Sequence, residues 1–188
     1  MGMRLHELHA SAVHTPLGLL PTAATFDLAA ALSGSRSLAR TGATLWWAGS
    51  LSAVFAGIAG LAASQEVKAY EKTTHDAMLV HGLANTGVTV VALGMSVWRA
   101  RHRPTLLSTL VGFGAVAATF WTAFLGGEIV YARGVGVKPA GGVADSPELL
   151  SREAPARLVR DAARGLGWAL REGARFLRAP SNVMEVSR

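Results

Sequence analysis

Two histidines stand at the start of apolar runs, and their imidazoles are the side chains in this sequence best suited to chemistry. His14 opens a run that also contains Asp27, and His81 opens another. Imidazoles inside membrane-spanning segments are rare and costly, and they usually serve a function. A neutral imidazole binds iron, zinc or copper, so two of them at equal depth on neighbouring helices could hold one haem b.

Several positions near these histidines suit a flat ligand. Asn85 lies about one helical turn after His81 and could hydrogen-bond a bound group or a neighbouring helix. Gly126 and Gly127 remove side chains where a ligand or another helix can approach closely. Arg133 could neutralise an acidic group, such as a haem propionate or a lipid phosphate. Helix packing followed by a glycine-rich exit loop would explain the same glycines.

The remaining histidines allow a different metal site. His9, His75 and Glu128, with other histidines of the same membrane face, could form a surface zinc or copper site. A second haem at His9 and His75 is not expected, because in a continuous helix His9 lies about 7–8 Å above His14 and points about 140° away. The chain has no cysteine, which excludes thiolate metal sites and iron–sulfur ligation by this chain.

Long uncharged runs predict the elements that must position these residues. Of the 188 residues, 51% are hydrophobic and 16% are charged, whereas a soluble domain has about 25% charged residues. A helix needs about 20 apolar residues to cross the hydrocarbon core. The sequence therefore predicts an all-α protein, an integral membrane four-helix bundle in residues 1–137. The expected spans are residues 13–32, 41–63, 77–98 and 105–130.

The charges between the spans predict the orientation. Residues 33–40 carry two arginines and residues 99–104 carry three, whereas the basic residues of the opposite side are spread among acids. Dense positive charge in short loops marks the cytoplasmic side. We therefore expect a multi-pass protein with both termini outside and with both span histidines near the outer face.

The tail, residues 138–188, predicts a helix of another kind. Residues 156–178 place arginines on one face and apolar side chains on the other. This pattern is typical of a basic amphipathic helix that lies in a membrane surface, and a helix packed on a partner subunit would share it. Nucleic-acid binding is not expected despite the net charge of +6, because the tail lacks a recognisable reader motif.

Three segments resemble a bacterial family of four-helix membrane proteins that is named as a domain of unknown function, number 2231. The segments are HASAVHTPLGLL (residues 9–20), HGLAN (81–85) and GGEIVYARGVGV (126–137). Members tend to be associated with Rieske-type iron–sulfur proteins and other respiratory components, which implies an electron-transfer role. Members of the family often have an acidic residue at the end of the second span. In this chain Glu66, at a shifted position, would have to take the place of that residue.

These observations lead to one main hypothesis. It is a membrane electron-transfer subunit in the bacterial cytoplasmic membrane that binds one haem b between the first and third spans, with His14 and His81 as axial ligands. Its partners would be the lipid bilayer, other membrane subunits, and a Rieske iron–sulfur protein, cytochrome c or quinol. The alternatives are a haem-free accessory subunit of a respiratory or related complex and the surface zinc or copper site. A stand-alone enzyme is less expected, because no nucleophile–base pair or dinucleotide fingerprint is visible.

Overall fold

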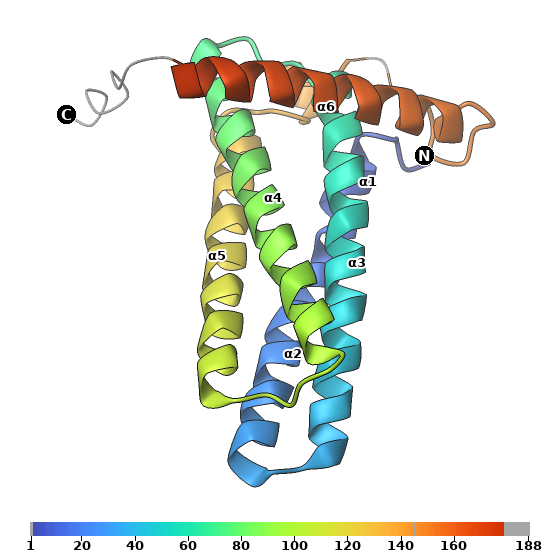
Figure 1. Cartoon of the computed structure of the whole chain (residues 1–188). Helices are drawn as coiled ribbons and strands as arrows, with labels where there is room; N and C mark the ends of the chain where they lie inside the picture. The colour runs from blue at the N-terminus through green and yellow to red at the C-terminus, as the bar shows by residue number, and fades with distance from the viewer. Residues whose placement is uncertain (1, 145, 179–188) are drawn as a thin grey trace.

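The protein is all-helical in the part that the structure describes, which confirms the predicted fold class. The computed structural model describes residues 2–144 and 146–178. In these residues, four helical segments are long and apolar enough to cross a membrane. They form a bundle, and a further helix lies crosswise at one end of it (Figure 1). The elements are α1 (Glu7–Ala12), α2 (His14–Ser33), α3 (Arg36–Glu66), α4 (Lys72–Arg99), α5 (Leu106–Tyr131), the short 3₁₀ helix η1 (Lys138–Ala140) and α6 (Ala154–Arg178).

The first membrane-crossing segment begins at Glu7, upstream of the predicted start at residue 13. α1 continues into α2 because Val13, between them, keeps helical backbone angles (φ −63°, ψ −23°). Pro16, the third residue of α2, has no N–H and cannot bond to the carbonyl oxygen of Ala12, the residue at which α1 ends. His9 therefore belongs to a membrane-crossing segment, as His14 does.

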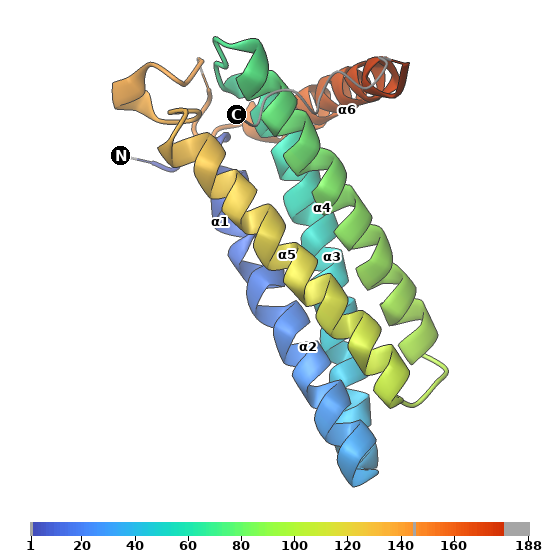
Figure 2. The same ribbon diagram turned by 90° about the vertical axis from the view of Figure 1, so that its left-hand side faces the viewer.

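The order of the helices places α2 and α4 on opposite corners of the bundle. α2 packs against α3 and α5, and α4 packs against the same two helices. Figure 2 shows α5 between α2 and α4 on one side of the bundle. Large apolar side chains such as Phe120, Trp121 and Phe124 are exposed on α5, as expected for helices that contact lipid.

Caps fix the turns at the end of the bundle opposite α6. Gly34 ends α2 with a left-handed φ of 70°, which favours glycine. Ser35 caps α3 and accepts a hydrogen bond from the N–H of Leu38. Thr105 and Ser108 form a reciprocal capping box at the start of α5. These side chains satisfy backbone groups that a helix end leaves without partners.

An ion pair is buried in the half of the bundle near these caps. Arg99 Nε donates to Asp27 Oδ2 at 2.8 Å, and Arg99 Nη2 donates to Asp27 Oδ1 at 3.0 Å. Trp46 Nε1 donates to the same carboxylate at 2.9 Å. The Arg99 and Asp27 side chains are only 2% and 1% exposed. Arg99 also donates to the carbonyl oxygens of Ala39 and His102. Arg99 is thus a buried partner of Asp27 and not the loop charge that its position in the sequence predicts.

A second buried acid anchors α6 to the end of α3. Glu66 is fully buried, and its Oε2 accepts a hydrogen bond from Ser146 Oγ at 2.7 Å. Arg157 Nε lies 3.5 Å from Glu66 Oε1 and 2.9 Å from Asp161 Oδ2. Gly165 sits directly against the main chain of α3, where any Cβ would clash. Charge pairing and a close backbone contact together hold α6 across the bundle end.

We predict that Asp27→Ala destabilises the bundle by about 3–5 kcal/mol, because it leaves the Arg99 guanidinium buried without a counter-charge. The free energy of unfolding can be measured in mixed micelles by titration with a denaturing detergent, followed by circular dichroism. Asp27→Ala combined with Arg99→Met should recover part of the loss, since the pair is then removed rather than broken. Asp76→Ala, at an exposed position of α4, should change stability by less than about 0.5 kcal/mol. Equal losses in Asp27→Ala and Asp76→Ala would contradict the buried pair.

Candidate histidine site

The imidazoles of His9 and His81 lie together inside the bundle, toward the end where α6 lies. Their ring centroids are 6.2 Å apart, and the ring planes make an angle of 83°. His9 comes from α1 and His81 from the first half of α4. Both side chains are half-buried. These two residues are called the histidine pair below.

A main-chain carbonyl group holds each ring of the histidine pair. His9 Nδ1 lies 2.9 Å from the carbonyl oxygen of Ala56 in α3. His81 Nδ1 lies 3.0 Å from the carbonyl oxygen of Thr122 in α5. A carbonyl oxygen can only accept, so each Nδ1 carries the proton and each Nε2 keeps its lone pair. Metal-binding histidines are commonly oriented in this way, through a hydrogen bond of the other ring nitrogen.

Two glycines leave room for the rings. A Cβ at Gly60 in α3 would lie 3.0 Å from His9 Cε1, and a Cβ at Gly126 in α5 would lie 2.9 Å from His81 Cε1. Both separations are shorter than ordinary van der Waals contact between carbon atoms. The imidazoles therefore pack directly against the α3 and α5 backbones, which fixes their positions.

Asn85 joins the site from the next turn of α4. Its Nδ2 donates to the carbonyl oxygen of His81 at 2.8 Å and lies 3.3 Å from His81 Nε2. Its Oδ1 accepts a hydrogen bond from Thr122 Oγ1 at 3.0 Å. Thr122 thus contacts the site twice, through its hydroxyl and its carbonyl group, and these bonds join α4 to α5 beside the rings.

His14 does not meet His81, and this corrects the predicted pairing. The His14 side chain is exposed, and its Nδ1 lies 3.3 Å from the carbonyl oxygen of Ser11. The step of five positions from His9 to His14 turns the two side chains roughly 140° apart. Since His9 faces α3, His14 faces outward from the bundle.

Two other residues predicted to bind the cofactor also lie apart from the histidine pair. Arg133 is exposed, and its Nη1 donates to Thr73 Oγ1 at 3.3 Å. A Cβ at Gly127 would face the ring of Tyr131 at 3.9 Å rather than an imidazole. Of the residues predicted to surround the cofactor, the structure brings His81, Asn85 and Gly126 together.

The alternative zinc or copper site is not assembled. His75 Nε2 lies 3.1 Å from the carbonyl oxygen of Ala69, and its ring lies 6.3 Å from that of Trp168 in α6. Across residues 2–144 and 146–178, no group of three or more histidine, aspartate and glutamate side chains is placed to hold a metal ion. His9, His75 and Glu128 therefore do not form a common site.

From the sequence, His9 is assigned to the alternative metal site and not to the haem, because the predicted span begins after it. From residue 5 to residue 13 the only charged residue is Glu7, so the apolar character of the span extends upstream, and that signal could have included His9. Gly60 and Thr122 were missed because nothing local marks them. Their role depends on which ring they face across the bundle.

We predict that Gly126→Ala destabilises the protein by about 1–3 kcal/mol, because the new methyl group overpacks the site against His81. Gly82→Ala is a matched control, since a Cβ there meets nothing within 4 Å, and it should stabilise α4 by up to about 1 kcal/mol. The same unfolding titration measures both. Gly126→Ala combined with His81→Ala should cost less than the sum of the single changes, and additive costs would contradict the contact.

A comparison with family models matches this chain to one described as a predicted membrane protein (DUF2231), over residues 5–139. The matched segment contains the four membrane-crossing segments described above and the histidine pair, and it ends before α6. No curated protein and no solved structure matches the chain.

Proposed function

The chain belongs to the DUF2231 family of predicted membrane proteins, and we propose that it is a membrane electron-transfer subunit that binds one haem b between His9 and His81. The observation that carries this proposal is the 6.2 Å separation of the two ring centroids. The proposal keeps one haem and His81 from the sequence analysis, and it replaces His14 by His9.

The separation of the rings would suit two histidines that hold one haem iron. Bonds between a metal and an imidazole nitrogen are about 2.0–2.1 Å long and the ring centroid lies about 1.2 Å farther on, so two rings on opposite sides of one metal would have centroids about 6.4–6.6 Å apart. The observed 6.2 Å is close to this value. Each ring plane contains its own metal–nitrogen bond, so the angle of 83° between the planes is compatible with shared ligation.

The small number of protein ligands favours haem over a bare metal ion. A structural zinc site has four protein ligands, and a catalytic zinc site has three. The described residues offer two imidazoles and no third histidine, aspartate or glutamate beside them. A haem brings four ring nitrogens of its own and needs one or two side chains from the protein.

Two axial histidines favour electron transfer over chemistry on oxygen. If His9 and His81 both held the iron, the haem would supply one-electron transfer to a redox partner and would leave no position for oxygen. In this proposal the carbonyl groups of Ala56 and Thr122 keep the Nδ1 protons in place, and both Nε2 lone pairs would bind the iron. Asn85 Nδ2, which lies 3.3 Å from His81 Nε2, would give up that contact. At Gly60 and Gly126 the bare backbones of α3 and α5 leave room for the rings.

We propose that the end of the bundle near α6 lies at the outer face of the bacterial cytoplasmic membrane. Without the buried Arg99, the opposite end still carries four exposed arginines, namely Arg36 and Arg40 at the start of α3 and Arg101 and Arg103 in the loop before α5. The arginines of α6 contribute less to the orientation. Positive charges set the orientation of a membrane protein mainly when they lie within roughly 15–20 residues of a span. A Rieske iron–sulfur protein, cytochrome c or quinol would then exchange electrons near this outer face.

We predict that the purified protein, expressed with added haem, shows a sharp Soret band and split bands after reduction. His9→Ala and His81→Ala should each lose most of the bound haem, because each removes one axial ligand. His14→Ala should keep the spectrum, since His14 points away from the bundle. Absorption spectra of detergent-solubilised protein measure all three, with circular dichroism to verify folding. A colourless wild-type protein would favour the haem-free accessory subunit, and haem loss in His14→Ala alone would restore the earlier pairing.

The absence of cysteine allows a clean test of the orientation. We predict that a cysteine introduced at Lys68, an exposed position near the α6 end, reacts with a membrane-impermeant maleimide in intact cells. A cysteine at the exposed Ser37, at the opposite end, should react only after the membrane is permeabilised. The reverse labelling pattern would place the α6 end inside.

A further inference from the structure

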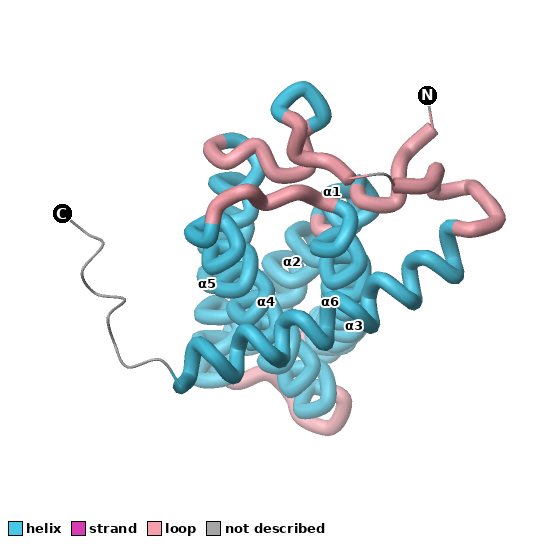
Figure 3. The backbone as a smooth tube through the Cα atoms, turned by 90° about the horizontal axis from the view of Figure 1, so that it is seen from above, coloured by secondary structure: helices cyan, strands magenta, loops and turns pink. Residues whose placement is uncertain are grey.

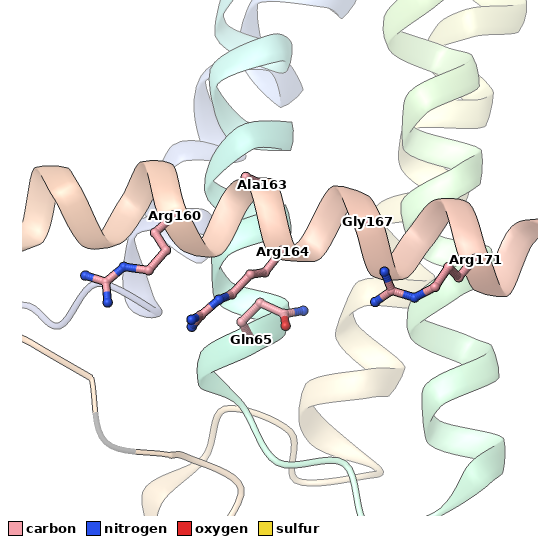
Figure 4. Close-up of a pocket in the computed structure, with 6 residues that line it drawn as sticks. All are labelled: Gln65, Arg160, Ala163, Arg164, Gly167 and Arg171. Carbon is pink, nitrogen blue, oxygen red and sulfur yellow. The ribbon is translucent and has the colours of Figure 1, made fainter.

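A row of arginines on α6 takes no part in the proposed haem site. Arg160, Arg164 and Arg171, called the arginine row below, line a groove of about 510 Å³ together with Gln65 at the end of α3. Figure 4 shows the three side chains extending from the same side of α6, toward the end at which α3 finishes. At a rise of 1.5 Å per residue, the row extends about 16 Å along the helix.

The positive charge of this row is largely uncompensated. Arg160 and Arg171 are exposed and form no ion pair with the part of the chain that the structure describes. Arg164 lies 3.4 Å from Asp161 Oδ1, and its side chain is 65% exposed. Asp161 is already the partner of Arg157 at 2.9 Å. The groove therefore presents guanidinium groups that are available to an external anion.

A separate edge of α6 is apolar and also uncovered. Val159, Leu166 and Leu170 are 70%, 49% and 65% exposed. They lie about 120° around the helix from the arginine row. The third side of the helix, with Asp161 and Gly165, is buried against α3. α6 thus has one face for the bundle, one apolar edge and one basic edge.

The position of α6 brings both uncovered edges to the level of the membrane surface. The helix crosses the end of the bundle on the side of α3 and α4, as seen from the side in Figure 1 and from above in Figure 3. The spanning helices leave the hydrocarbon core at this level. A helix with these properties lies in the interface, with its apolar side among the acyl chains and its basic side at the phosphates.

We propose that the arginine row binds the phosphate of an anionic phospholipid in the leaflet beside α6, while Val159, Leu166 and Leu170 enter the acyl region of the same leaflet. A lipid satisfies both uncovered edges at once. An acidic protein that approached from water would pair with the arginines and leave the apolar edge exposed. The segment responsible lies outside the residues that match the family model, so this binding is a property of the tail and is independent of haem.

The test compares binding of fluorescent phosphatidylglycerol and phosphatidylcholine to the full chain in a neutral detergent. The wild-type protein should prefer phosphatidylglycerol by about tenfold or more, because each basic residue near an anionic headgroup contributes to binding. Replacing Arg160, Arg164 and Arg171 together by Gln should remove most of this preference. An unchanged preference in this triple variant would overturn the proposal and leave the row to a protein partner.

A matched control removes three exposed arginines at the opposite end of the bundle. Arg36→Gln, Arg40→Gln and Arg101→Gln together change the net charge equally and should retain most of the lipid preference. An equal loss in this control would show a general charge effect and overturn the specific site.

Two measurements on the wild-type protein keep the proposal testable if the triple variant fails to fold. Raising the salt concentration from 0.05 M to 0.5 M should weaken the preference several-fold, because partly exposed charges are screened. Soluble glycerol phosphate should compete poorly, since it lacks acyl chains for the apolar edge. A salt-independent preference, or displacement by glycerol phosphate at concentrations equal to those of the lipid, would overturn the proposal.

Discussion

The hydrocarbon core contains no water, so polar groups on the spanning helices must bond to one another, and the rest of the structure depends on this constraint. Asp27 and Arg99 satisfy it through a two-point ion pair between α2 and α4, the diagonal helices. His9 and His81 satisfy it through carbonyl groups of α3 and α5. Each bond fixes the rotation of a helix about its own axis. Rotation then decides which side chains meet inside the bundle.

The histidine pair shows how one constraint serves both packing and chemistry. The Nδ1 atoms of His9 and His81 complete hydrogen bonds that position the rings. The Nε2 atoms keep their lone pairs, and Nε2 of His81 lies 3.3 Å from Asn85 Nδ2. A neutral imidazole has one donor and one acceptor nitrogen, so bonding the donor to the helix backbone directs the acceptor toward a ligand. The fold therefore fixes the proton on one nitrogen of each ring without an acidic side chain nearby.

The fold class was predictable because a bilayer imposes a minimum length on each apolar helix and a regular period on an amphipathic one. The site was predictable in part. His81 and Asn85 lie inside an obvious span. To predict His9 as part of the site, one would have to know that Val13 does not interrupt the helix. The choice between His9 and His14 depends on helix rotation. Contacts with Gly60 and Ala56 on α3 set that rotation, and neither the spacing nor the composition of α1 and α2 contains this information.

The burial of Glu66 has a consequence for biogenesis. Its carboxylate is fully enclosed at the end of α3, yet its partners Ser146 and Arg157 lie far along the chain. During synthesis this carboxylate emerges from the ribosome long before either partner, and until they arrive it must remain hydrated or protonated. The membrane domain can therefore insert early, but its α6 end cannot close until the tail has been translated. For some time a newly made chain presents an open end through which a bulky group could enter.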